Sequence, residues 1–389
     1  MAKKNGHTKE LKKLQSVVAE MKSALLERED HVDTFTCALL SGENVFFIGK
    51  PGTAKSMMCR EYFGRIKGAS YFEWLMSKTT VPEELFGPVD LDKYMNEQNF
   101  SRNTEDKLPE ATFAFLDEPG KASSSILNTL LTLINEKKFH NGRTPQDVPL
   151  RSLVSASNEF FEGEEMEALF DRYVVKLEVV SINERVNRIE LLSGNTASTR
   201  KASITLKELD TLVASCKEVE VPDDIIKTIL KIQDKLREEG IWLSDRVLYR
   251  TCANRDRNGD MRPNILKAHA LLNGRTEVNE DDLMVLEHCF WHTIEERDKI
   301  SVIIKKMSNP DAMKVDTIIE NSKSLHHDAM ASSSSMETVF QAVEKLKQGE
   351  QELEDIIDHP RKKRIHGRAK KALKVVQGYR EEIVREKLG

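Results

Sequence analysis

The chain has 389 residues, enough for two or three domains, and 39% of them are apolar and 32% charged. A net charge of −5 does not predict a nucleic-acid-binding protein. The five cysteines are scattered without CxxC spacing, so they indicate neither a disulfide framework nor a zinc site. Together with a charged N-terminus and no apolar run of membrane-spanning length, they favour a cytoplasmic protein with no membrane association.

Two helices and a strand are predicted at the start of the chain. Apolar residues at helical spacing predict an amphipathic helix over residues 9–29. A second helix is predicted over 32–40, with Gly42 suited to the position after its last turn. The apolar run 45–48 then predicts a buried strand.

A glycine-rich octapeptide, Gly49-Lys-Pro-Gly-Thr-Ala-Lys-Ser56, follows this strand and precedes a helical pattern over 57–67. Strand, glycine loop and helix are the context of a phosphate-binding loop. Gly49 and Gly52 allow a tight turn that points N–H groups inward, and the helix N-terminus adds the positive end of its dipole. We expect Lys55 to lie between the outer phosphates and the Ser56 hydroxyl to bind Mg²⁺.

Ala54 departs from the common pattern G-x-x-x-x-G-K-[ST], in which glycine precedes the lysine. Alanine readily adopts helical φ and ψ, so we expect a loop that closes into a helix to accept it. The alternative is an ordinary glycine turn in which Lys55 and Ser56 are merely exposed. The later motifs favour the phosphate-binding interpretation.

Two more strands are predicted, over 71–75 and 112–116, and the second delivers Asp117 and Glu118 at its C-terminal end. Ligands bind at that end of open α/β sheets. Asp117 can hold Mg²⁺ directly or through water, and Glu118 can orient and deprotonate an attacking water. Many strand-end acidic pairs only begin loops, so this interpretation depends on the upstream phosphate loop.

The segments around these strands carry helix and turn signals. Thr80 and Glu83 predict a capping box that opens a short helix, and the polar stretch 90–107 predicts an inserted segment. A strong amphipathic helix is predicted over 123–138. Asn141-Gly142 then predicts a type I′ hairpin turn.

The next strand, predicted over 152–156, ends just before Asn158, whose amide can reach a water or a γ-phosphate but in isolation more often marks a turn. A short acidic helix is predicted over 164–170, followed by Arg172 and a strand over 173–177. Arg172 is either a surface charge or a finger that reaches the nucleotide of a neighbouring subunit.

From residue 181 onward the patterns predict helices without strands, over 206–216, 222–239, 243–255 and 279–292. The tail predicts a helical hairpin over 337–386 that turns at Pro360. Its basic connector, 361–364, is interpreted as a solvated tip in preference to a nucleic-acid contact.

Taken in order, these motifs resemble the MoxR family of AAA+ ATPases and, within it, the RavA branch. The resemblance spans about residues 11–291. It implies an α/β fold with a central parallel sheet, an all-α lid and an α-helical C-terminal extension, at 1–180, 181–298 and 299–389. Beside the phosphate loop it rests on Pro82-Glu-Glu-Leu-Phe-Gly-Pro88, Leu108-Pro-Glu-Ala111, Phe115-Leu-Asp-Glu118, Ile126-Leu-Asn-Thr-Leu-Leu131, Ile134-Asn-Glu136, Ser155-Ala-Ser-Asn-Glu159, Ala168-Leu-Phe-Asp-Arg172 and Ser244-Asp-Arg246.

The resemblance implies a role for each residue of this sequence that matches a functional position of the family. Glu118 matches the catalytic glutamate, Asn158 the sensor-one residue, Arg172 the trans-acting finger and Arg246 the sensor-two arginine of the lid. Pro119-Gly120 departs from the family pattern just behind the acidic pair. ATP would contact Gly49, Lys50, Pro51, Gly52, Thr53, Ala54, Lys55, Ser56 and Met57, with Mg²⁺ at Ser56 and Asp117.

The implied function is Mg²⁺-dependent ATP hydrolysis by a hexameric ring that remodels a protein partner, with a von Willebrand factor A domain protein as the expected partner. Two alternatives stay open from the sequence. One is a nucleic-acid motor that uses the basic tail, and the other is a nucleotide-gated assembly platform with little turnover.

Overall fold

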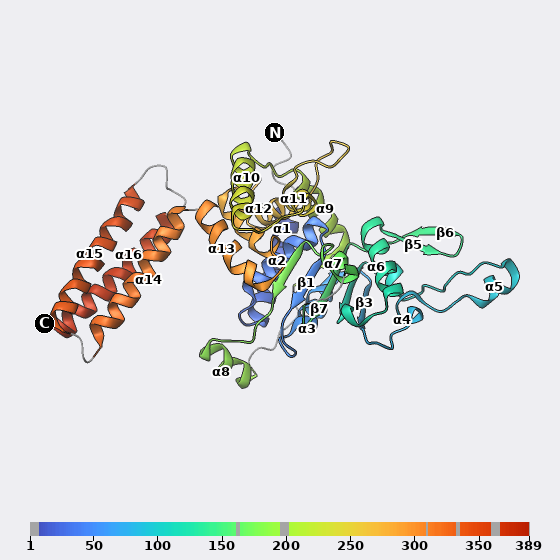
Figure 1. The fold of residues 1–389 in the computed structure, drawn as a ribbon, viewed down its shortest axis with the longest axis horizontal. Coiled ribbons are helices and arrows are strands. Elements are labelled where there is room, and N and C mark those ends of the chain that lie inside the picture. Colours follow the sequence, from blue (N-terminus) through green and yellow to red (C-terminus); the bar gives the residue numbers. More distant parts are fainter. Residues whose placement is uncertain are drawn as a thin grey trace. The chain divides into compact units, whose positions relative to one another are not determined.

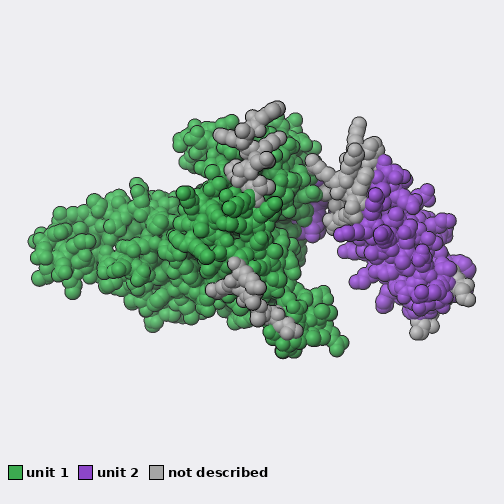
Figure 2. Space-filling view, turned by 180° about the vertical axis from the view of Figure 1, so that it is seen from behind, with its two compact units in different colours: residues 1–300 green, residues 301–389 purple. Residues whose placement is uncertain are grey.

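The computed structural model describes residues 8–160, 164–194, 202–308, 310–331, 335–358 and 366–388. The chain divides into two compact units, Met1–Ile300 and Ser301–Gly389 (Figure 2). Among the described residues, no helix combines the length and the apolar character that a membrane span requires.

A parallel sheet forms the centre of the first unit (Figure 1). In the described part of the chain it has five strands in the order β3-β4-β7-β1-β8, and each pairs in parallel with its neighbours. The central strands β1 and β7 are buried along their whole length, as expected for a sheet covered on both faces. The predicted fold class is confirmed. The strands are β1 Val45–Ile48, β3 Tyr71–Leu75, β4 Phe113–Asp117, β7 Ser152–Ser157 and β8 Val175–Glu178.

Helices surround this sheet, and all but α5 and α8, which the sequence analysis did not predict, begin within about three residues of their predicted positions. They are α1 Thr8–Ala24, α2 Glu29–Ser41, α3 Lys55–Phe63, α4 Pro82–Phe86, α5 Leu91–Glu97, α6 Ser124–Glu136, α7 Glu164–Phe170 and α8 Arg185–Ser193. The predicted helix over 9–29 is wrong at its end. Glu27 has a left-handed φ of 59°, and its carboxylate accepts the backbone N–H groups of Asn183 and Glu184, each at 2.8 Å. This turn separates α1 from α2.

The predicted capping box is displaced by one residue. The Thr80 hydroxyl accepts the Ser77 N–H at 2.8 Å, and α4 begins instead after Val81, whose N–H donates to the Glu84 carboxylate at 2.9 Å. The reason is Pro82, which occupies the first helical position because its ring fixes φ and it has no N–H to leave unpaired.

A hairpin, β5 Lys138–Asn141 and β6 Thr144–Asp147, lies beside the segment that carries α5 (Figure 1). The type I′ prediction is wrong, because Gly142 has a φ of 66° but Arg143 does not have a positive φ. Asn141 belongs to the strand, and its amide pairs with the backbone N–H and C=O of Arg102 at 2.6 and 3.1 Å. These hydrogen bonds therefore connect the β5–β6 hairpin to the inserted segment that carries α5.

The prediction of no strands after residue 181 is also wrong. β9 Ile204–Thr205 pairs in parallel with β2 Ile66–Lys67. Helices follow it: α9 Leu206–Lys217, α10 Asp223–Glu238, α11 Asp245–Cys252 and α12 Ile265–Leu272, then the 3-10 helix Glu280–His288 and α13 Ile294–Ser308.

Buried ionic groups hold these helices in place. The Glu43 carboxylate, fully buried just after α2, accepts hydrogen bonds from Arg250 of α11 at 2.9 Å and from Arg262 at 3.4 Å. Asp282, also fully buried, forms hydrogen bonds with His269 of α12 at 2.6 Å and with both terminal nitrogens of the Arg275 guanidinium group. Removing one partner from such a group leaves a buried charge without compensation.

The second unit is a helical bundle of α14 Pro310–Met330, α15 Met336–Asp358 and α16 His366–Ile383, with a short π-helical turn over Val384–Leu388. Its core is its own, built from residues such as Val339, Leu346 and Val376. The predicted hairpin arms correspond to α15 and α16. Pro360 and the basic connector 361–364 lie outside the described residues.

Candidate nucleotide site

Three adjacent strand ends bring the predicted site residues together. Ile48 of β1 pairs with Ser157 of β7, and Ala156 of β7 pairs with Asp117 of β4. The phosphate loop, Asn158 and the acidic pair therefore begin at the same edge of the sheet, which is the edge where α/β folds bind ligands.

The phosphate loop needs glycine at its first position. Gly49 has a φ of 153°, and a Cβ atom there would lie 2.1 Å from the carbonyl oxygen of Val179. Its N–H donates to the Ser157 carbonyl at 3.1 Å, which fixes the start of the loop on β7. Gly52 has a φ of 79° and completes the turn, while the Thr53 hydroxyl donates to the Lys50 carbonyl at 2.9 Å.

Ala54 corrects one sequence-based argument. We expected it to be helical, but it has φ 67° and ψ 22° and lies just before the first residue of α3. This is the left-handed conformation that glycine would adopt without strain at the same position. An L-residue there is strained by about 1–2 kcal/mol.

Lys55 opens α3 and points back over the loop. Its ammonium donates to the carbonyls of Gly49 and Lys50 and to the Asn158 side-chain oxygen, the last two at 3.0 Å. Burial lowers the pKa of Lys55, and the nearby carboxylates of Asp117 and Glu118 raise it. The contact with Asn158 links the phosphate loop to the end of β7.

The acidic pair is held in two different ways. Glu118 has a left-handed φ of 53°, and its carboxylate accepts the Asn158 N–H at 3.2 Å and the Ser157 hydroxyl at 3.4 Å. Such strain in a non-glycine residue concentrates at functional sites. Burial and the neighbouring Glu118 raise the pKa of Asp117, while Lys55 lowers it. Pro119 and Gly120 form a short 3-10 turn behind the pair.

The donor set fits a magnesium ion shared with a substrate. Ser56 and Asp117 offer a hydroxyl and a carboxylate, the oxygen donors that Mg²⁺ prefers. Among the described residues, no group of three or more His, Cys, Asp or Glu side chains could hold a metal ion. Mg²⁺ is usually held by one or two protein oxygens together with phosphate oxygens and water, and Ser56 and Asp117 are donors of that kind.

Arg172 and Arg246 lie together at the carboxylate of Asp171. Arg172 follows α7 and donates to Asp171 at 2.8 Å, and Arg246 in the first turn of α11 reaches the same carboxylate at 3.5 Å. Arg246 also donates to Asn135 at 3.5 Å. Asp171 and Asn135 are therefore contacts of Arg246, and Arg172, Arg250 and Glu43 are close enough to affect its charge.

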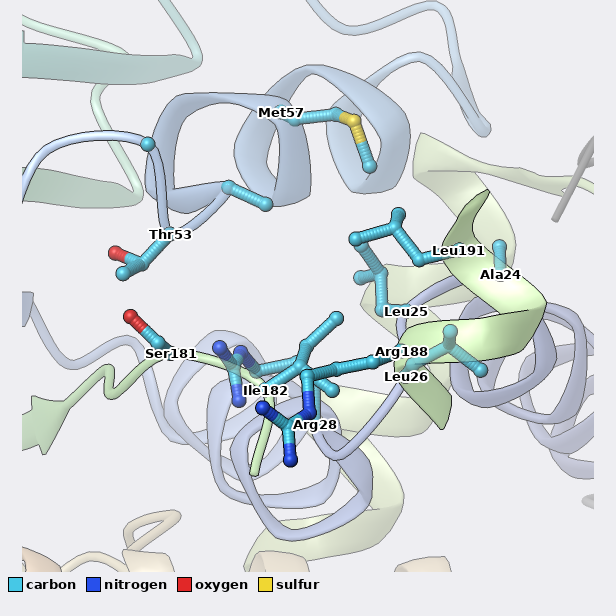
Figure 3. Close-up of a pocket in the computed structure, with 12 residues that line it drawn as sticks. Ala24, Leu25, Leu26, Arg28, Thr53, Met57, Ser181, Ile182, Arg188 and Leu191 are labelled. Atoms are coloured by element: carbon cyan, nitrogen blue, oxygen red, sulfur yellow. The ribbon is translucent and has the colours of Figure 1, made fainter. Parts of the chain in front are cut away.

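Sequence reasoning missed an apolar cavity of about 480 Å³ beside the phosphate loop (Figure 3). Thr53 and Met57 line one side, and residues from the α1–α2 turn, from α8 and from the segment entering α8 line the others (Figure 3). Such a cavity suits the apolar ring faces of a flat group such as a nucleobase. Its remaining lining residues include Leu25, Leu26, Arg28, Ser181, Ile182, Arg188 and Leu191.

A second cavity, of about 350 Å³, also borders the loop and shares Ser181 with the first. Gly49, Lys50 and Asn158 line it. The first cavity is lined by Gly52, Thr53 and Ala54. The phosphate loop therefore borders two neighbouring cavities, one at Gly49 and Lys50 and the other at Gly52, Thr53 and Ala54.

Two family models match the chain. The model of the MoxR domain in MoxR–vWA–β-propeller ternary systems matches residues 12–214, which is more than half of the chain. A model of the AAA lid domain matches residues 224–304.

The chain belongs to the MoxR family of AAA+ ATPases.

Similar proteins extend this finding. An uncharacterised protein of Methanocaldococcus jannaschii is 36% identical over 303 residues, covering 78% of this chain and 76% of that one. Chaperone MoxR1 of Mycobacterium tuberculosis is 25% identical over 178 residues, covering 45% and 46%. The crystal structure of a proposed ATPase from Cytophaga hutchinsonii matches with a TM-score of 0.58 and 17% identity, covering 77% and 96%, which supports the fold.

Membership of the MoxR family implies ATPase activity in general terms and an AAA+ fold. The role of each residue stays a prediction. Both family matches end by residue 304, so the bundle of the second unit lies outside them.

Proposed function

We propose that this MoxR protein is a RavA-like, Mg²⁺-dependent ATPase that assembles into a hexameric ring and remodels or matures a protein partner. The observation that carries the proposal is the 3.0 Å contact between the Lys55 ammonium and the Asn158 amide oxygen. It occurs at the sheet edge where β4 also delivers Asp117 and Glu118.

In this proposal the triphosphate lies along the phosphate loop, with its base in the 480 Å³ cavity. Lys55 turns from the carbonyls of Gly49 and Lys50 to the outer phosphates. Bound Mg²⁺, held by Ser56 and Asp117, would neutralise charge on those phosphates. The start of α3 adds backbone N–H groups and the positive end of its dipole.

Glu118 is the proposed general base. A water molecule forms a bond to the γ-phosphorus while the bond to the bridging oxygen breaks, and the carboxylate of Glu118 takes the proton. The Asn158 N–H and the Ser157 hydroxyl orient that carboxylate, at 3.2 and 3.4 Å. The Asn158 side chain, already at Lys55, would hold the γ-phosphate or the water.

Arg172 and Arg246 are proposed to act together on the nucleotide of an adjoining subunit. Both guanidinium groups contact the Asp171 carboxylate. If Arg172 acts across a subunit boundary, Arg246 is therefore close enough to act there as well. Arginines supplied in this way stabilise charge on the transferred phosphoryl group and raise rates by about 10³ or more. A ring of identical subunits provides such a boundary at every site.

The partner is proposed from the names of relatives. The matched family model describes MoxR domains in systems with von Willebrand factor A and β-propeller proteins, and one relative is named a chaperone. These names support a von Willebrand factor A domain protein as the partner. A cytoplasmic location is part of the proposal and is supported by the free thiols of all five cysteines.

Steady-state ATP hydrolysis tests the proposal. Glu118→Gln should lower kcat by about 100-fold or more while ATP·Mg²⁺ still binds, because only the base is lost. Lys55→Ala should abolish measurable binding. Glu352→Gln, an exposed carboxylate of α15, is the matched control and should change neither.

Two outcomes would overturn parts of the proposal. Equal rates for wild type and Glu118→Gln would contradict the hydrolytic role and favour a nucleotide-gated platform. Undiminished ATP·Mg²⁺ affinity in Lys55→Ala would contradict the nucleotide site itself.

A further inference from the structure

Asp171 connects the core of the first unit with the lid helix α11. It follows α7 and precedes Arg172, so its backbone belongs to the core. Its carboxylate contacts Arg172 at 2.8 Å and Arg246 at 3.5 Å through the same oxygen, Oδ2. The other oxygen accepts the Ser244 hydroxyl at 3.5 Å. One side chain therefore meets the finger arginine and two residues from the start of α11.

The backbones on both sides of Asp171 are fixed by other contacts. The Asn44 amide donates to the Arg172 carbonyl at 3.2 Å. α11 is held by Arg250 on the buried Glu43 carboxylate, at 2.9 Å. The Ser244 hydroxyl also accepts the Val247 N–H at 3.2 Å and so caps the helix. The lid helix α11 is therefore held by contacts besides those of Asp171, which leaves the carboxylate of Asp171 to act on the two arginines.

The charges at this point do not balance. Two guanidinium groups share one carboxylate, and each is partly exposed, at 26% for Arg172 and 30% for Arg246. Burial, and then repulsion from Arg172, lowers the pKa of Arg246, while Asp171 raises it. Because guanidinium groups stay protonated near neutral pH, the cluster keeps an excess positive charge and can accept a further anion.

The hydrogen bonds are also incomplete. The Arg172 Nε is buried and has no hydrogen-bond partner among the described residues. The 3.5 Å separation between Arg246 and Asp171 is long for a hydrogen bond, so the attraction is mainly between charges. A guanidinium group held in this way can turn to a new acceptor without breaking a strong bond.

We infer that Asp171 is a positioning residue that presents Arg172 and Arg246 as a pair to the triphosphate of an adjoining subunit. In the assembled site an oxygen of the terminal phosphate becomes a further acceptor for both arginines, while the carboxylate of Asp171 keeps the two guanidinium groups together. The inference rests on the proposed function. It makes Asp171 act through the arginines and not on the nucleotide of its own subunit.

Asp171→Asn tests the inference, because it keeps the side-chain size and removes the charge that holds the two cations together. kcat should fall by about 10-fold, the lower range for residues that support a catalytic group, while the KM for ATP changes by less than about 2-fold. Asp171→Glu restores the charge and should recover much of the rate. It also serves as the readout if Asp171→Asn does not fold.

Mixed assemblies provide the second readout. Glu118→Gln subunits cannot hydrolyse ATP but keep an intact arginine pair, and Asp171→Asn subunits keep Glu118. When the two kinds of subunit assemble in equal amounts, half of the sites contain Glu118. Half of those sites face a neighbouring subunit whose arginine pair is intact. The mixture should therefore reach about a quarter of wild-type activity. If the subunits do not complement each other, only the Asp171→Asn half contributes, at about a tenth of the normal rate, and the mixture should reach about a twentieth. A purely structural defect in Asp171→Asn subunits would not be rescued in this way.

Several results would overturn the inference. Provided that the wild-type protein hydrolyses ATP, four results would each contradict the inference. They are a wild-type kcat in Asp171→Asn, an effect of Asp171→Asn on KM alone, no recovery of the rate in Asp171→Glu, and a mixture with about a twentieth of wild-type activity. Failure of wild type to hydrolyse ATP would instead overturn the proposed function, and this inference with it.

Discussion

Ala54 has a left-handed backbone conformation, with φ 67° and ψ 22°, directly before Lys55. Ala54→Gly should increase the free energy of unfolding of the nucleotide-free protein by about 0.5–1 kcal/mol. The relief of about 1–2 kcal/mol of strain is partly offset by the greater freedom of glycine in the unfolded chain. Urea unfolding of the full chain without nucleotide measures this.

Gly52→Ala is the matched control for that prediction. Gly52 has a φ of 79°, and a Cβ atom there would meet nothing within 4 Å, so the exchange adds backbone strain without a steric clash. It should lower the free energy of unfolding by about 1 kcal/mol. If Ala54→Gly destabilises the protein while Gly52→Ala behaves as expected, the strain at Ala54 is offset by contacts of its methyl group.

The sequence was sufficient to find the residues at the strand ends but not the cavity beside them. Lys55, Glu118 and Asn158 stand next to apolar runs, and parallel strands bring such positions to one edge. The cavity is lined by Leu25, Ile182 and other residues from segments that meet only in the folded protein. The conformation of Ala54 was missed because alanine by itself favours the helix.

At the scale of elements, Asp282 stabilises the lid. Its carboxylate is buried, which raises its pKa, but hydrogen bonds from Arg275 and His269 outweigh burial, so the net pKa is lowered. A carboxylate with a lowered folded pKa contributes stability that is present above its unfolded pKa, about 4, and is lost as pH falls through the folded value.

Asp282→Asn should therefore lower the free energy of unfolding by about 3 kcal/mol at pH 7, since it leaves Arg275 without its buried partner. The difference from wild type should shrink below about pH 4, where the wild-type carboxylate also becomes protonated. Thermal unfolding from pH 7 to pH 3 measures both. A difference that stays constant over this range would show that charge at Asp282 is not what stabilises the lid.

Element boundaries failed for identifiable reasons. The cap of α4 moved to Val81 because Pro82 suits only the first helical position. β2 and β9 were missed because two-residue strands have no periodicity to detect, and the pairing of Ile66 with Ile204 joins distant parts of the chain. Long apolar patterns such as that of α6 were predicted to within two residues.

At the scale of the whole molecule, the bundle of the second unit has its own core, and every residue assigned to the nucleotide site lies in the first unit. Removing residues 310–389 should leave ATP·Mg²⁺ affinity within about 2-fold of the full chain, because no proposed ligand contact is lost. Equilibrium binding of a fluorescent ATP analogue measures this.

A much larger loss of affinity, in a truncated protein that still unfolds cooperatively, would show that the bundle supports the site. Unchanged affinity with reduced hydrolysis would point instead to a role of the bundle in assembly. Sedimentation of both proteins with nucleotide separates these outcomes.

The turn at Glu27 bears on how quickly a nucleotide can bind. Its carboxylate accepts Asn183 and Glu184 N–H groups at 2.8 Å and the Asn187 amide at 3.0 Å, and so ties the end of α1 to the segment entering α8. These are two walls of the 480 Å³ cavity. Their spacing is already set when the chain folds, so an arriving base need not immobilise a loose loop. Capture should then be governed by diffusion and orientation, with little entropy lost to ordering.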